Sequence, residues 1–144
     1  MTLLKQIEKF LIGAVLCLGS GSALGEVVVV VSPNSTLTAL NISQVTDIFL
    51  GRASHFPNGE RAVPVDQAEG SAARNEFYQN YAGRSPSQIK AHWSKLIFTG
   101  KGYPPKEVRA QEIKKIVSED THLIGYLDSS ALDARVKVIK IVDE

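Results

Sequence analysis

The sequence contains a single cysteine, Cys17, in 144 residues. One cysteine cannot form an internal disulfide, and this excludes disulfide-stapled scaffolds, cysteine zinc sites and dithiol redox motifs. The three histidines, His55, His92 and His122, lie far apart and show no metal-ligand spacing. We therefore expect neither a metal site nor a cofactor.

A large excess of charge of one sign is also missing. Sixteen basic residues against fifteen acidic ones give a formal net charge of +1. Proteins that bind nucleic acid usually carry a strong positive field, so we expect no nucleic-acid partner. The composition, 44% hydrophobic and 22% charged, is that of a globular protein, and the length predicts one domain.

No apolar run is long enough for a transmembrane helix. The run from Phe10 to Leu18 is far shorter than the ~20 residues that such a helix needs. Lys5 and Lys9 precede it, and small residues from Gly19 to Ala23 follow, which is the pattern of a cleavable signal peptide. The alternative is an uncleaved N-terminal anchor.

This pattern divides the chain into a signal peptide over residues 1–25 and a mature domain over residues 26–144. We accordingly expect an exported protein that resides in the periplasm. The mature part is long enough to bury one hydrophobic core without disulfides.

After the signal peptide the pattern alternates between strands and helices, which predicts an α/β domain with a mixed sheet of four to five strands and helices on both faces. We expect strands over Val27–Val31, Arg61–Val65, Leu123–Leu127 and Val136–Val142. We also expect four helices: one capped by Ser43, one from Ser71 to Tyr81, one that starts at Ser85, and one from Ala110 to Glu119. The helix after Ser85 is expected to direct Ile89, Trp93, Leu96 and Ile97 into the core.

A bend between a predicted strand and a predicted helix carries the candidate site. Gly70 lets the backbone approach a ligand, and the first-turn amides at Ala72 and Ala73 present the positive end of a helix dipole. The Ser71 hydroxyl can donate to an anion or cap its own helix. A capped helix with nothing bound is the alternative, and the carboxylate of Glu69 beside these amides favours it.

Two other groupings remain weaker hypotheses. Ser71, His92 and Asp128 could be drawn as a catalytic triad, but no nucleophile elbow surrounds the serine, so we expect no enzyme. The segment from Thr99 to Gly102 is interpreted as a turn rather than a second anion-binding loop.

Two segments and one strand resemble periplasmic phosphate-binding proteins of ABC transporters. Leu40–Val45 leading into Asp47–Arg52 resembles the start of the second lobe of those proteins, and Val63–Ser71 resembles their strand and acidic-Gly-Ser helix start. Ile124–Tyr126 resembles a later strand of that lobe. The resemblance implies a single three-layer lobe of the type 2 periplasmic-binding fold.

The resemblance also implies an anion site at Gln67, Glu69, Gly70, Ser71 and Ala72. Gln67 stands where the family typically has an arginine, and alanines follow Ser71 where glycine and threonine are usual. An arginine makes paired, charge-assisted hydrogen bonds to phosphate, so its loss should weaken binding.

These inferences lead to an expected role in binding phosphate or a related oxyanion for ABC-type uptake or sensing. The expected partners are the anion, an ABC permease or envelope protein, and a second copy in a homodimer that could supply the missing wall. The alternative is an interaction module of the cell envelope that keeps the lobe and has lost the ligand.

Overall fold

The structure is a computed structural model that describes residues 25–144. Apart from Gly25, the predicted signal peptide lies outside the described residues, as does Cys17. None of the helices described between residues 25 and 144 is long and apolar enough to cross a membrane.

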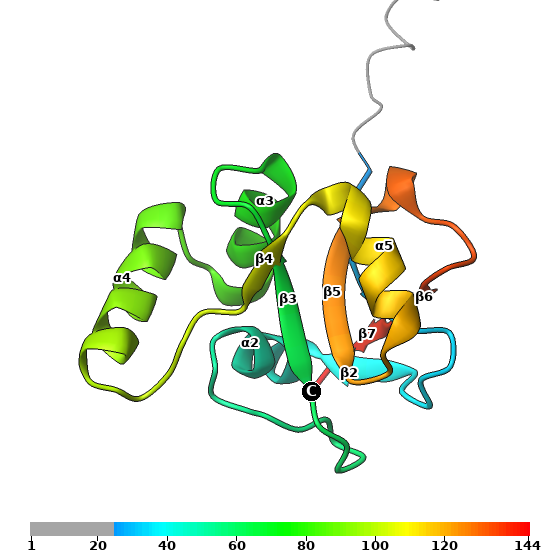
Figure 1. Ribbon diagram of the computed structural model, residues 1–144, viewed down its shortest axis with the longest axis horizontal. Helices are drawn as coiled ribbons and strands as arrows, with labels where there is room; N and C mark the ends of the chain where they lie inside the picture. Colours follow the sequence, from blue (N-terminus) through cyan, green and yellow to red (C-terminus); the bar gives the residue numbers. More distant parts are fainter. Residues whose placement is uncertain (1–24) are drawn as a thin grey trace, which may run out of the picture.

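The centre of the described chain is a mixed five-stranded sheet in the order β4-β3-β5-β1-β6 (Figure 1). Strand β3 (Val63–Gln67) is parallel to both β4 (Lys106–Val108) and β5 (Leu123–Asp128). Strand β1 (Val27–Val31) is antiparallel to β5 and to β6 (Lys137–Val138). Because β3 and β5 are parallel, their carboxyl ends meet at the same edge of the sheet.

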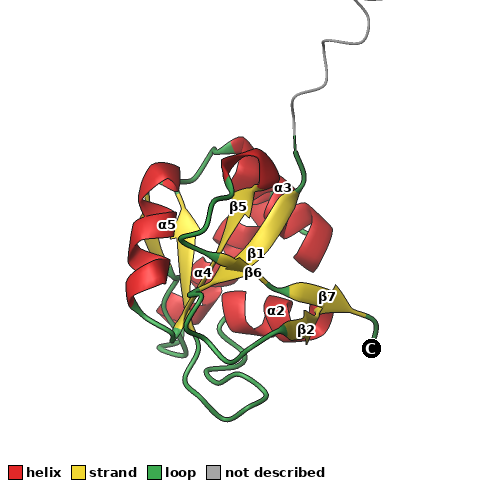
Figure 2. Cartoon of the chain, turned by 90° about the vertical axis from the view of Figure 1, so that its right-hand side faces the viewer, coloured by secondary structure: helices red, strands yellow, loops and turns green. Residues whose placement is uncertain are grey.

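Helices cover both faces of this sheet, as predicted. Figure 2 shows α5 on one side, and the hydrophobic contacts place α2, α3 and α4 on the other. The remaining elements are α2 (Ile42–Phe49), α3 (Ala72–Ala82), α4 (Pro86–Phe98), α5 (Ala110–Glu119), the 3-10 helix η1 (Ser129–Ala131), and a small parallel pair, β2 (Ala39–Asn41) with β7 (Lys140–Val142).

The five consecutive valines of β1 serve two cores at once. Val27, Val29 and Val31 belong to the larger core with α2, α3 and α4, whereas Val28 and Val30 pack into the smaller core with α5. Successive side chains of a strand point to opposite faces, so a strand covered on both faces needs an apolar residue at every position. The predicted doubly buried strand is therefore confirmed.

Aromatic rings fill the centre of the larger core. Phe77 of α3 stacks on Tyr126 of β5, with centroids 4.1 Å apart and an interplanar angle of 2°. Phe49 of α2 meets both rings edge-on, at 4.7 Å from Phe77 and 5.9 Å from Tyr126. These contacts fix the spacing between α2, α3 and the sheet.

Several predicted details are wrong. Asn41, and not Ser43, caps α2, because its side chain accepts from the Gln44 amide in a capping box. Ile97 is 48% exposed instead of buried. The last predicted strand is split into β6 and β7 because the Lys140 amide donates to Thr38 at 3.0 Å, which turns the chain toward β2.

Strand β3 begins two residues later than expected, at Val63. Arg61 pairs instead with His55, and the Ala62 amide donates to Ser54 at 2.9 Å. Strands β2 and β4 were not predicted, because each has three residues and too little apolar pattern to reveal it.

Candidate functional site

The bend after β3 has the geometry expected of a glycine turn and a capped helix. Gly70 has φ of 89°, in the left-handed region that side chains disfavour. The Ser71 hydroxyl oxygen accepts a hydrogen bond from the Arg74 amide at 3.0 Å, so this serine caps α3. Within the described residues, no acceptor receives a hydrogen bond from the amides of Ala72 and Ala73.

A cleft of about 400 Å³ lies at the carboxyl ends of β3 and β5. This is the position at which α/β sheets commonly bind ligands, because helices that follow the strands begin there. Its lining comes from β3, α3, α5, β5, η1 and the segment after η1, and consists of Gln67, Ala73, Ala110, Gln111, Lys114, Leu127, Asp128, Ala131 and Arg135.

The N-termini of two helices border this cleft. Ala73 lies in the first turn of α3, and Ala110 and Gln111 begin α5. Arg109 occupies the N-cap of α5 and provides no side-chain hydrogen bond to the helix. Free amides and two positive dipole ends therefore converge on one concavity, an arrangement that favours an anion.

Two cations at the cleft are held by one carboxylate. Lys114 Nζ lies 2.9 Å from Asp133 Oδ2, and Arg135 Nη2 lies 2.7 Å from the same oxygen. Hydrogen bonds from the Arg135 side chain and amide, with a further one from Lys114, lower the pKa of Asp133 well below its usual range. Asp133 thus stays charged and offsets part of the positive charge that an incoming anion would meet.

A second carboxylate lines the cleft directly. Asp128 Oδ1 accepts from the amide of Ser130 at 2.9 Å and from its hydroxyl at 2.7 Å. Both hydrogen bonds lower the pKa of Asp128, and the bond from the Ser130 amide has the larger effect. With Lys114 and Arg135 matched by Asp128 and Asp133, the attraction for an anion comes mainly from the helix termini and their amides.

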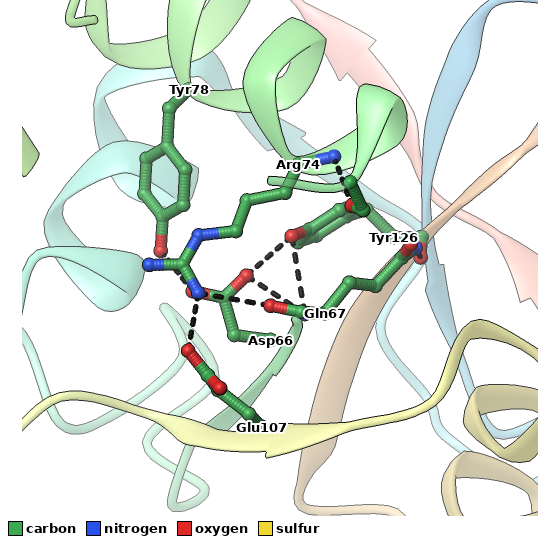
Figure 3. Close-up of polar contacts among 7 residues, drawn as sticks. Asp66, Gln67, Arg74, Tyr78, Glu107 and Tyr126 are labelled. Atoms are coloured by element: carbon green, nitrogen blue, oxygen red, sulfur yellow. Dashed lines mark hydrogen bonds and ion pairs between the residues drawn. The ribbon is translucent and has the colours of Figure 1, made fainter. Parts of the chain in front are cut away.

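A buried polar network lies between α3 and the sheet (Figure 3). Asp66 is 1% exposed and accepts from the hydroxyls of Tyr78, at 2.5 Å, and Tyr126. It also accepts from the Gln67 amide at 2.9 Å. Burial, reinforced by the charge of Asp66, raises the pKa of both tyrosines, so both hydroxyls remain donors.

Arg74 is directed into this network and away from the cleft. Its Nη1 donates to the Gln67 carbonyl at 2.9 Å and to Glu107 at 2.6 Å, and lies 3.9 Å from Asp66. Burial opposes the charged form, but Asp66 and Glu107 outweigh it and raise the pKa of Arg74. Figure 3 shows the guanidinium between these carboxylates, so it does not replace the missing arginine of the resembled family.

The five residues predicted to bind an anion do not form one cluster. Gln67 lines the cleft, but it is 2% exposed and its Nε2 donates to the Tyr126 carbonyl at 2.9 Å. Gly70, Ser71 and Ala72 form the bend beside the cleft without lining it. Glu69 lines a separate, much smaller depression with Arg74 and Tyr78 and is not among the residues that line the cleft.

Ala73, whose amide was predicted to face an anion, lines the cleft, whereas Gln111, Lys114 and Arg135 were not predicted as lining residues. Because β4 pairs with β3, a predicted β4 would have placed the start of α5 beside the start of α3. The three residues of β4 have too little apolar alternation to reveal a strand. The contact of Arg135 with the cleft depends on the path of the chain after η1, for which no sequence signal exists.

The alternative site arrangements are not formed. His92 bonds through Nε2 to the Leu50 carbonyl at 2.9 Å, while Asp128 bonds to Ser130 and Ser71 to its own helix, so no triad assembles. In residues 25–144 no group of three potential metal ligands comes together. The segment from Thr99 to Gly102 follows α4 and does not line the cleft.

No family model matches the sequence, and no curated protein matches it. Solved structures do match its fold. A protein from Clostridium perfringens, assigned to phosphate ABC transport as a substrate-binding protein and solved with bound phosphate, superposes with a TM-score of 0.64 and 20% identity. The match covers 83% of this chain and 46% of that one.

Two further structures give the same result. An ABC-type phosphate transport receptor from Vibrio cholerae has a TM-score of 0.63 and 18% identity, covering 83% of this chain and 47% of that one. A possible phosphate-binding protein from Planctomyces limnophilus has a TM-score of 0.63 and 14% identity, covering 84% and 43%. The described chain is therefore a single α/β lobe with the type 2 fold of phosphate-transporter substrate-binding proteins, and it spans about half of their length.

Proposed function

We propose that this chain binds an inorganic oxyanion of the phosphate type in the cleft between α3 and α5. The observation that carries the proposal is the convergence of two helix N-termini on one concavity at the carboxyl ends of β3 and β5. The names of the structural neighbours, one with phosphate bound, support this ligand class. The proposed role is binding and not catalysis.

The proposed setting is the periplasm, with the N-terminal segment as a signal peptide and an ABC permease as partner in uptake or sensing. One lobe provides one wall of a binding site, and an open, hydrated site weakens each electrostatic interaction. A second chain, either another copy or a partner protein, would supply the opposite wall.

A thermal unfolding experiment in phosphate-free buffer tests the proposal. The protein is melted with phosphate, with sulfate and with chloride at matched ionic strength. A ligand at 100 times its Kd stabilises the folded state by about 2.7 kcal/mol. Each kcal/mol raises the Tm of a domain of this size by roughly 3–6 °C, so binding is readily detected.

Matched variants locate the site. Lys114→Ala removes a cation that lines the cleft, whereas Lys115→Ala removes an exposed cation next to it that does not. We expect the phosphate-dependent shift to fall in the first variant and to persist in the second. Equal shifts in phosphate and chloride would refute the proposal.

One observation favours a second candidate, the interaction module without a small ligand. The side chains of Gln67 and Arg74 are already committed to protein partners, and Asp133 engages both cleft cations. This second role would be supported if the Tm of the wild type showed no anion-specific shift and if crosslinking captured a defined envelope protein.

A further inference from the structure

The positive charge of the chain is concentrated around one helix. Residues 77–106 contain five basic residues and no aspartate or glutamate, in a protein whose whole chain has a formal net charge of +1. The rest of the chain is therefore net negative. The five basic residues lie just before α4, along it, or in the segment up to the start of β4: Arg84, Lys90, Lys95, Lys101 and Lys106.

The same region exposes large apolar side chains. Phe98, at the last position of α4, is 93% exposed, and Tyr103 in the following loop is 80% exposed. Ile97 is 48% exposed. Helix α4 lies at one end of the longest axis of the molecule (Figure 1), so Ile97 and Phe98 are carried on a peripheral element.

No ion pair within the described residues offsets the charge of these basic side chains. None of the five basic side chains forms an ion pair in residues 25–144. Glu107, the nearest acidic residue in the sequence, is held by Arg74 at 2.6 Å. The positive charges of these five side chains are therefore not offset by an ion pair in the described part of the chain.

A basic groove of about 620 Å³ extends this surface along one flank of α4. Arg84, Lys95 and Arg52 contribute its cations, with Gln88 and His92 beside them. Arg52 lies 3.8 Å from Asp47, so its charge is partly offset, whereas the other two cations have no such partner in the described part of the chain.

We propose that the α4 tip, defined as Lys95, Ile97, Phe98, Lys101, Tyr103 and Lys106, docks on the surface of a bilayer that contains anionic lipids. Aromatic and aliphatic side chains flanked by lysines suit the membrane interface, where the rings enter the headgroup boundary and the ammonium groups remain at the lipid phosphates. Protein interfaces usually pair charges of both signs, whereas a segment with five cations and no carboxylate of its own matches a partner of uniformly negative charge.

Fluorescence of a Phe98→Trp variant of the full chain tests insertion directly. Trp93 is the only natural tryptophan and is 5% exposed, so the wild type supplies the background signal. With vesicles of phosphatidylcholine and phosphatidylglycerol, the introduced indole should shift to shorter wavelength and be quenched by brominated lipid. No shift and no quenching of vesicle-bound protein would overturn the proposal, because another segment would then make the contact.

Charge variants of the full chain test the electrostatic part. Each lysine near an anionic surface contributes about five-fold to partitioning, so Lys95→Ala with Lys101→Ala should weaken binding to these vesicles about 25-fold. The matched control is Lys115→Ala with Lys140→Ala, two exposed lysines outside the α4 tip, which should leave partitioning unchanged. The N-terminal segment is the same in every variant and cancels in the comparison.

Equal weakening by the two pairs, or equal binding to vesicles of phosphatidylcholine alone, would refute the docking surface. The oxyanion cleft is unaltered in the Lys95/Lys101 variant, so its phosphate-dependent Tm shift should match that of the wild type. Failure of the membrane proposal would therefore be distinguishable from failure of the oxyanion proposal.

Discussion

The Arg74 guanidinium donates to the backbone carbonyl of Gln67 at 2.9 Å, closing a link across the bend between β3 and α3. This bond joins the first turn of the helix to the end of the strand, and Glu107 on β4 extends the link to the neighbouring strand. Gln67, which lines the cleft, is therefore held by hydrogen bonds of both its side chain and its carbonyl within the protein. The same bonds withdraw Arg74 from any ligand.

Asp66→Asn should destabilise the protein strongly. The carboxylate is buried, and two tyrosine hydroxyls and the Gln67 amide donate to it, while Arg74 lies 3.9 Å away. An amide leaves donors unsatisfied and Arg74 without its buried counter-charge, so we expect a loss of about 3–5 kcal/mol in the free energy of unfolding, measured by urea denaturation.

The control for this variant is Asp47→Asn. Asp47 is 45% exposed at its side chain and lies 3.8 Å from Arg52, so its replacement should change the unfolding free energy by about 0.5 kcal/mol or less. Similar losses in both variants would contradict a special role for the buried network.

Gly125→Ala should destabilise by overpacking the contact between β5 and α5. A Cβ at this position would lie 3.2 Å from Ile113 Cγ2 and 3.3 Å from Val65 Cγ2, both buried. We expect a loss of about 1–3 kcal/mol in the unfolding free energy. Gly102→Ala is the control, because the nearest atom to a Cβ at Gly102 would be 3.8 Å away, and this change should be nearly neutral. An equal loss of unfolding free energy at both sites would show that α5 moves to make room for the methyl group at position 125.

Alkaline pH should unfold the protein through Tyr78 and Tyr126. Burial, then the charge of Asp66, raises their pKa in the folded state, whereas unfolded tyrosine titrates near pH 10. Their stabilising contribution is therefore complete below about pH 10 and declines as the pH rises above it, because only the unfolded chain releases the protons.

Tyrosinate absorbance and circular dichroism followed together check this expectation. The ionisation of Tyr78 and Tyr126 should coincide with loss of the folded signal, and a Tyr126→Phe variant should show a smaller coincident absorbance step. Ionisation of these two groups in protein that remains folded would contradict the assignment.

Asp133→Asn should strengthen oxyanion binding. Asp133 engages both Lys114 and Arg135, and its lowered pKa keeps it charged at neutral pH. Removing this exposed carboxylate frees both cations, so the Kd for phosphate, measured by calorimetry, should fall by about three- to ten-fold. An unchanged Kd would place the anion away from these cations. Asp143→Asn, near the C-terminus, makes the same change in net charge outside the cleft and is the matched control.

Locally encoded features were predictable from the sequence. The five valines of β1 and the helix start at Ser85 depend on neighbouring residues, and both are present as predicted, the second with a capping box between Ser85 and Gln88. Alternating apolar positions and helix caps act over a few residues, so no long-range information is needed. The ends of predicted strands were wrong where a distant segment of the chain took a backbone hydrogen bond, as at Lys140, whose amide donates to the carbonyl of Thr38.

The candidate site was only partly predictable for the same reason. Gly70 and Ser71 form the predicted bend, since the glycine turn and the serine cap are local. The destination of the Arg74 side chain depends on β4, which places Glu107 beside it, and a three-residue strand leaves almost no trace in the sequence.

The sequence by itself determined the α/β alternation, the doubly buried β1, and the helix starts at Ser71 and Ser85, because these follow from periodicity and capping. Only the tertiary structure decided that α3 and α5 begin at one cleft, since residues more than thirty positions apart meet there through the pairing of β3 with β4 and β5. The basic run over residues 77–106, which a net charge of +1 conceals, is readable from the sequence itself. Only the tertiary structure left its five cations without an ion pair in the described residues and left Phe98 and Tyr103 exposed.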